Sequence, residues 1–210
     1  MNRTLLFAAA LLLSAISFGQ GDKPSSGRID RFVITSSEII APRDISVWLP
    51  EDYDATKRYA VLYMHDGQMI FDSTITWNKQ EWKADEVAAG LMAQGSIRQC
   101  IIVGVWNRDQ YRYEEYFPEK ALTFMNESQR AKFVRKSMKS EPIGDAYLRM
   151  LVKEVKPYID SHYATLRDMN NTFVMGSSMG GLISLYAICE YPEVFGGAGC
   201  ISTHLPMTGV

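Results

Sequence analysis

The stretch TFVMGSSMGGLISLYA, Thr172–Ala187, joins a short apolar run to a helix-like sequence through a cluster of glycines and serines. The pattern G-x-S-x-G lies at its centre, where Gly176 and Gly180 flank Ser178 two residues away on each side. A nucleophilic serine on a sharp strand-to-helix turn needs small neighbours there, because larger side chains would collide with the strand or the helix. The stretch therefore predicts a strand, a tight turn carrying Ser178, and a helix.

Apolar runs of strand length alternate with segments of helical periodicity along the rest of the chain. Strands are expected at 31–36, 44–50, 59–64, 100–106, 172–175 and 196–202, and helices at 83–95, 145–163 and 182–191. The first two strands are expected to be antiparallel, and the later alternation predicts parallel strands joined by right-handed crossovers. The segment 118–140 is polar and is expected to be a partly helical excursion. The pattern indicates an α/β fold with helices on both faces of a mostly parallel sheet.

Composition favours one globular domain, because 47% of the 210 residues are hydrophobic and 22% are charged. The formal net charge of −2 provides no basic surface for nucleic acid or an anionic membrane. Residues 1–19 place Arg3 before an apolar run that is shorter than the roughly 18 residues needed to span a bilayer, which is the layout of a signal peptide. Residues 20–27 are expected to be a flexible lead-in, and 28–210 the folded domain. The protein is therefore expected to be exported, periplasmic or secreted, without a stable membrane anchor.

Three cysteines lie in apolar contexts without C-x-x-C spacing: Cys100, Cys189 and Cys200. This spacing predicts neither a metal site nor a dithiol motif. Buried free thiols are one expectation, and pairing of two of them in an exported protein is the other. No metal or organic cofactor is expected.

Candidate catalytic groups cluster at the carboxyl ends of the predicted parallel strands, where ligands bind in open α/β sheets. Ser178 is a better candidate than Ser177, because only Ser178 has glycines at both positions. An oxyanion needs backbone N–H donors, and the residue after the nucleophile, Met179, supplies one. HDGQ, ending at Gln68, follows the strand 59–64 and is the candidate for the second donor, with an ordinary Asp-Gly turn as the alternative. A serine that only caps the helix is the alternative at the first motif.

The segments YAVLYMHDGQMIFD, VGVWN, RYEEYFP and NTFVMGSSMGGLISLYAICEYPEVFGGAGCISTH resemble the putative esterase family of the α/β-hydrolase superfamily. That family is related to siderophore, feruloyl and acetyl-xylan esterases and to the antigen 85 mycolyltransferases. The resemblance covers 28–204. It implies an α/β-hydrolase three-layer sandwich, with the nucleophile at Ser178 and the oxyanion donors at the backbone of Gln68 and Met179. In the family the acid and the histidine follow later in the chain, and nothing here matches them.

Three further residues are expected near the pocket. His65 adjoins the oxyanion segment as a structural or substrate-side group, and the resemblance places His204 in the pocket wall, with a role as base as the alternative. Trp106 belongs to a set of loop aromatic residues that either line a pocket or pack against the sheet. Arg112 and Glu114 are expected to form local polar links, and Asp66 to orient its loop. His162 is expected to be remote, at the far end of a helix.

The function that these patterns predict is that of an exported serine esterase acting on carboxylic esters through an acyl-enzyme. The substrate stays open among acyl groups on carbohydrate, aryl esters and siderophore-type lactones, and the oligomeric state stays open too. The domain is expected to lack its last strands, which would leave a hydrophobic sheet edge near Cys200 and little activity in these 210 residues. A non-catalytic hydrolase-like binding protein or an inactive fragment is the alternative.

Overall fold

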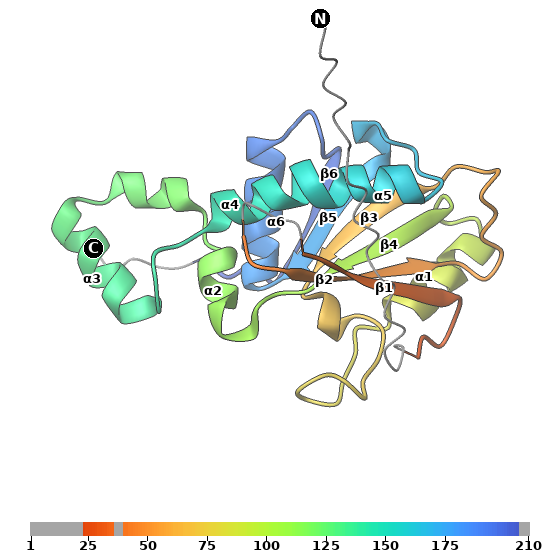
Figure 1. The fold of residues 1–210 in the computed structure, drawn as a ribbon, viewed down its shortest axis with the longest axis horizontal. Coiled ribbons are helices and arrows are strands. Elements are labelled where there is room, and N and C mark those ends of the chain that lie inside the picture. The colour runs from red at the N-terminus through yellow and green to blue at the C-terminus, as the bar shows by residue number, and fades with distance from the viewer. Residues whose placement is uncertain (1–22, 36–39, 206–210) are drawn as a thin grey trace, which may run out of the picture.

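The structure is a computed structural model that describes residues 23–35 and 40–205, so the expected signal peptide lies outside the described residues. A six-stranded sheet runs through the centre, with the strand order β1-β2-β4-β3-β5-β6 (Figure 1). The strands are β1 Arg28–Ile34, β2 Arg43–Leu49, β3 Ala60–His65, β4 Cys100–Val105, β5 Thr172–Ser177 and β6 Gly197–Ile201. Each expected strand is present, within one to three residues of the predicted bounds.

The strand directions agree with the sequence prediction. β1 pairs antiparallel with β2, and β2 pairs antiparallel with β4. β3 pairs in parallel with both β4 and β5, and β5 pairs in parallel with β6. Because β3, β4, β5 and β6 all run the same way, the loops that follow them emerge at one edge of the sheet. This edge brings the segment after His65 next to the turn after Ser177.

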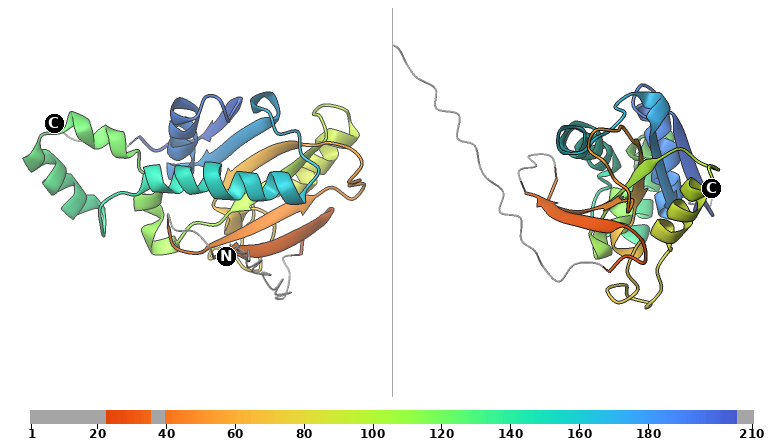
Figure 2. Two further views of the ribbon diagram at one scale, coloured as in Figure 1. Left: turned by 45° about the horizontal axis from the view of Figure 1, so that its top comes forward. Right: turned by 90° about the vertical axis from the view of Figure 1, so that its right-hand side faces the viewer.

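Helices cover both faces of the sheet, so the expected three-layer α/β sandwich is confirmed. On β3, Val61 and Tyr63 belong to the core shared with α4, α5 and α6, whereas Met64 belongs to the core of the opposite face with α1. This alternation follows from the two-residue period of a strand. Figure 2 shows α1 and the α4–α5 helix on opposite sides of the sheet. The helices are α1 Ala84–Ala93, α4 Gly144–Met150, α5 Lys156–His162 and α6 Met179–Glu190.

The expected helix 145–163 contains a wide turn at its centre. A π-helical turn, Leu151–Val155, joins α4 to α5 and ends just before Pro157. Proline has no N–H to donate to the carbonyl four residues earlier, so the regular ladder is interrupted there. The predicted apolar face is confirmed by the burial of five residues: Leu148, Leu151, Val152, Val155 and Ile159.

The expected excursion consists of a 3-10 helix, Glu119–Phe124, and α3, Glu127–Ser137. Asn126 begins α3 with a capping box, in which its side chain accepts from the Gln129 N–H at 2.9 Å and the Gln129 side chain accepts from the Asn126 N–H at 3.0 Å. Figure 1 shows these two helices extending away from the sheet. The excursion begins after α2, Arg112–Glu115, which follows a 3-10 turn, Asp109–Tyr111.

Two expectations differ from the structure. The described part of the lead-in is anchored, because the Lys23 N–H donates to Asp72 at 3.0 Å and the Ser25 N–H donates to Asp85 at 2.8 Å. The buried carboxylates of Asp72, in the loop before α1, and of Asp85, in α1, hold this segment in place. The three cysteines are free, but Cys189 near the end of α6 and Cys200 on the edge strand β6 are both exposed.

The exposed edge expected near Cys200 is present in the described sheet. β6 is its last strand, and Ile201 is 46% exposed there. Within residues 23–35 and 40–205, the helices are all too short or too polar to cross a bilayer.

Candidate active site

Ser178 is the single residue between β5 and α6, and its backbone is strained, with φ 58° and ψ −117°. Positive φ is unfavourable for residues other than glycine, and such strain is typical of functional turns. The Ser178 side chain makes no capping hydrogen bond to α6, although it occupies the N-cap position. The helix-capping alternative therefore has no hydrogen bond to support it. The strand-to-helix turn expected from G-x-S-x-G is present.

Residues 176–180 form this turn and are here called the elbow. The two glycines at its ends allow β5 and α6 to approach closely. A Cβ on Gly176 would lie 2.6 Å from the carbonyl carbon of Gly180, a distance that side chains do not tolerate. A Cβ on Gly180 would lie 3.3 Å from a carboxylate oxygen of Asp66 and 3.5 Å from the Cβ of His65. The first turn of α6 therefore lies directly against the end of β3.

The end of β6 holds the elbow from its other side. The Ser178 N–H donates to the Ile201 carbonyl at 2.9 Å, and the His204 N–H donates to the Ser178 carbonyl at 3.1 Å. His204 is exposed, and its ring lies 6.4 Å from the ring of Tyr113 in an edge-to-face arrangement. The structure thus brings His204 beside the elbow through its backbone.

The segment Asp66–Met69, here called the oxyanion loop, makes its sharp turn at Asp66. Asp66 adopts the left-handed region with φ 60° and ψ 45°. Gly67, the next residue, allows close packing. A Cβ on Gly67 would lie 2.6 Å from Trp106 and 2.7 Å from the carbonyl carbon of Gly104 on β4.

Two backbone donors are available where the oxyanion loop meets the elbow. The described residues offer no hydrogen-bond acceptor to the N–H groups of Gln68 and Met179. The Gln68 side chain holds its own loop, because its Oε1 accepts from the Asn107 N–H at 3.2 Å. Met179 is the first residue of the twelve-residue α6, whose positive dipole end favours negative charge. Both N–H groups are therefore free to donate to a bound acceptor.

His65 lies in the interior and is fully buried. Its Nδ1 is 2.8 Å from the Tyr147 hydroxyl, and its Nε2 has no hydrogen-bond partner among the described residues. Burial lowers the pKa of His65 to about 4, so the ring is neutral at pH 7. Of its two expected roles, the structural one fits this environment.

Trp106 packs beside the oxyanion loop and is partly exposed. Its Nε1 donates to the Ser46 hydroxyl at 3.0 Å, and the Arg31 guanidinium lies 3.8 Å from the centre of its ring.

His162 ends α5 with its ring stacked 3.9 Å from that of Tyr158, as expected for a remote residue. No salt bridge within the described part of the chain joins a histidine to a carboxylate.

Sequence reasoning missed the partner of Asp66. Arg112 was expected to form local polar links, but its Nε and Nη2 donate to the two carboxylate oxygens of Asp66, each at 2.6 Å. These residues are 46 positions apart. The available signal was the location of both residues after parallel strands, whose carboxyl ends meet at one edge.

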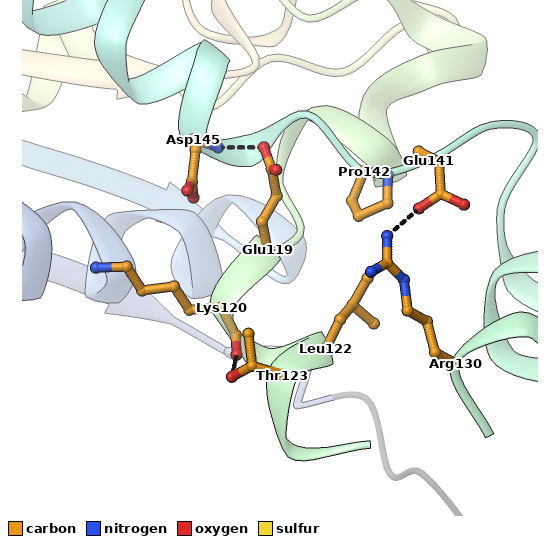
Figure 3. Close-up of a pocket in the computed structure, with 8 residues that line it drawn as sticks. All are labelled: Glu119, Lys120, Leu122, Thr123, Arg130, Glu141, Pro142 and Asp145. Atoms are coloured by element: carbon orange, nitrogen blue, oxygen red, sulfur yellow. Dashed lines mark hydrogen bonds and ion pairs between the residues drawn. The ribbon is translucent and has the colours of Figure 1, made fainter. Parts of the chain in front are cut away.

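The described cavities lie away from the elbow. One of about 430 Å³ lies between the start of β1, the end of β2 and the end of α1. Another, of about 370 Å³, lies where the excursion meets α4 (Figure 3) and is lined by Glu119, Lys120, Leu122, Thr123, Arg130, Glu141, Pro142 and Asp145. Its Arg130 and Glu141 pair with each other at 2.8 Å. Among the residues that the structure describes, no three His, Cys, Asp or Glu side chains are grouped for metal binding.

The chain is similar to several known proteins. The chain is 24% identical over 161 residues to the uncharacterized protein YbbA of Bacillus subtilis (strain 168), covering 76% of this chain and 56% of that protein. The ferulic acid esterase of Anaeromyces mucronatus, solved with ferulic acid, matches with a TM-score of 0.58 and 22% identity over 85% of this chain and 59% of that one. The IroE-like serine hydrolase of Shewanella oneidensis matches with a TM-score of 0.61 and 23% identity. The match covers 84% of this chain and 51% of that one. The chain thus spans less than two thirds of the length of each.

The solved structures show the fold, which is that of the α/β-hydrolase-type esterases. The model of the family described as "Putative esterase" matches residues 36–209, which include the oxyanion loop, the elbow and all strands from β2 onward. The chain belongs to the putative esterase family.

Proposed function

We propose that this protein is a serine esterase in which Ser178 is the nucleophile and the backbone N–H groups of Gln68 and Met179 hold the oxyanion. The observation that carries the proposal is the strained Ser178 backbone, with φ 58° and ψ −117°, together with a side chain that caps nothing. A serine under structural constraint alone would be expected to use its hydroxyl for the helix N-terminus. Strain that leaves the hydroxyl free favours a chemical role.

The proposed reaction proceeds through an acyl-enzyme. The Ser178 oxygen forms a bond to the ester carbonyl carbon, the carbonyl π electrons move to oxygen, and the hydroxyl proton passes to a general base. Collapse of the intermediate breaks the bond to the alcohol, which leaves with that proton. Water then attacks the acyl group by the same steps and releases the acid and the free serine.

The two N–H donors and the α6 N-terminus would stabilise the negative charge of both tetrahedral intermediates. The general base and its acid are not assigned among the described residues. His65 is enclosed and hydrogen-bonded to Tyr147, and His162 is at the end of α5. His204 meets the elbow through its N–H, while its ring lies against Tyr113.

We further propose carboxylic esters of aromatic or carbohydrate-linked groups, or siderophore-type lactones, as substrates. This is supported by the names of relatives, which include a feruloyl esterase of Xylanibacter ruminicola and an enterobactin esterase of Shigella flexneri. Export to the periplasm or the exterior is proposed from the sequence of residues 1–19. No cofactor enters the proposed reaction.

Labelling with a fluorophosphonate probe tests the proposal, because the reagent modifies only activated serines. In a protein that includes the general base, the wild type is expected to be labelled, Ser178→Ala to lose the label, and Ser177→Ala to keep it. The adjacent serine is a matched control, since both substitutions remove one hydroxyl from the elbow. A wild-type protein that takes up no label would contradict the proposal and favour a hydrolase-like binding protein.

A further inference from the structure

The Arg112 guanidinium connects the oxyanion loop to the elbow. Its Nε and Nη2 donate to the Asp66 carboxylate, each at 2.6 Å, and Nη2 also donates to the Ser177 carbonyl at 3.2 Å. The Asp66 side chain is 3% exposed and that of Arg112 28% exposed. One side chain therefore contacts the segments on which both proposed oxyanion donors lie.

The oxyanion loop depends on this contact, because Asp66 is unfavourable in two ways. Its left-handed conformation costs roughly 1–2 kcal/mol for a residue with a side chain. Its carboxylate is buried, and a buried charge needs a partner. Arg112 supplies two of the side-chain hydrogen bonds to that carboxylate, and Asn107 Nδ2 supplies another at 2.6 Å.

Arg112 can act as a fixed point because α2 is itself held to the sheet. α2 has four residues and is too short to be stable alone. Glu115, its last residue, forms a fork-to-fork pair with Arg43 of β2 through contacts of 3.0 and 2.5 Å. Both side chains are almost fully buried. The buried pair fixes α2, and α2 presents Arg112 to the oxyanion loop.

We propose that Arg112 is a positioning residue, which holds the oxyanion loop against the elbow so that the Gln68 and Met179 N–H groups point at one oxyanion. This inference rests on the proposed function. The N–H donors act on charge that develops only in the transition state. Displacing them therefore lowers kcat, and KM stays nearly unchanged because acylation and deacylation use the same two donors and are slowed alike.

Arg112→Gln and Arg112→Lys test the role with p-nitrophenyl acetate as substrate. Arg112→Gln is expected to lower kcat about 10- to 100-fold with KM within about threefold, since small misplacements at a reacting centre have effects of this size. Arg112→Lys is expected to be intermediate, because an ammonium keeps the charge but not the fork. Arg130→Gln, which removes an exposed arginine–glutamate pair in the excursion, is the matched control and should leave kcat unchanged.

Inhibition by an alkyl trifluoromethyl ketone adds a readout that reports on the oxyanion. The Ser178 adduct of this ketone carries an oxyanion, so its Ki is expected to rise by the factor by which kcat/KM falls. The double variant Asp66→Asn with Arg112→Gln separates positioning from stability. Arg112→Gln alone leaves the buried Asp66 carboxylate without its cation and is expected to lower the melting temperature. The double variant removes that charge, so its melting temperature is expected to return towards the wild-type value while kcat stays low. Recovery of kcat together with stability would overturn the positioning role.

The outcomes distinguish this inference from the proposed function. Ester hydrolysis that is lost in Ser178→Ala but unchanged in Arg112→Gln overturns the role of Arg112 alone. A kcat that falls without any rise in the ketone Ki overturns it also. Hydrolysis that survives Ser178→Ala overturns the proposed function, and the role of Arg112 with it.

Discussion

Gly176 of β5 lies so close to Gly180 of α6 that a Cβ on Gly176 would be 2.6 Å from the Gly180 carbonyl oxygen. The crossing of strand and helix at the elbow therefore requires glycine for space. Gly176→Ala is expected to lower the free energy of unfolding by about 1–3 kcal/mol, because the backbone must shift to relieve the overlap. Denaturant unfolding of the two proteins measures this difference.

Gly90 of α1 is the matched control for that substitution. A Cβ there would meet no heavy atom within 4 Å. Gly90→Ala is expected to stabilise the protein by about 0.5–1 kcal/mol, since alanine is the better helix former. Equal effects of the two substitutions would contradict the steric account of the elbow.

Ser178→Gly and Ser178→Ala separate backbone strain from the loss of the hydroxyl. Both variants are expected to lose activity, but only glycine accepts a φ of 58° without strain. Ser178→Gly is expected to be more stable than Ser178→Ala by about 1 kcal/mol. Glycine relieves the backbone strain of about 1–3 kcal/mol, and this gain exceeds the conformational entropy that the more flexible glycine loses on folding. Calorimetric melting of the pair checks the order, and an Ala variant at least as stable as the Gly variant would be the contrary result.

His65 is expected to make stability depend on pH. Its pKa is about 4 in the folded state and close to 6.5 when unfolded, so the unfolded state binds more protons between these values. Stability should therefore be fully present above pH 6.5 and be lost as pH falls towards 4, by about 3 kcal/mol from this residue.

Urea unfolding at pH 7 and pH 4.5 measures this dependence. His65→Gln is expected to be less pH-dependent than the wild type, whereas His162→Gln, which changes an exposed ring, should keep the wild-type dependence. An unchanged dependence in His65→Gln would show that other groups cause the loss.

The central strands were predictable because β3, β4 and β5 are apolar runs covered on both faces. The motif around Ser178 also predicted the turn, since its spacing reflects a local steric need. The Arg112–Asp66 and Arg43–Glu115 pairs were missed, because they join residues 46 and 72 positions apart. Such pairs depend on the order of strands in the sheet, which local patterns do not encode.

The surface positions of Cys189 and Cys200 were missed for a related reason. An apolar neighbourhood in the sequence indicates burial only when another element covers it. β6 is the edge of the described sheet, so Cys200 on it is exposed despite its apolar neighbours, and Cys189 is exposed near the end of α6. Anchoring of the lead-in through Asp85 depends likewise on a contact about 60 positions away.

The most direct test of the account is to trap the acyl-enzyme. The protein is mixed with a p-nitrophenyl ester, quenched in acid within the first turnover, digested, and analysed by peptide mass spectrometry. The account predicts that the acyl group is found on Ser178 and is absent from the Ser178→Ala protein. Release of p-nitrophenol with no acyl group on Ser178, or with the group on Ser177, would contradict it.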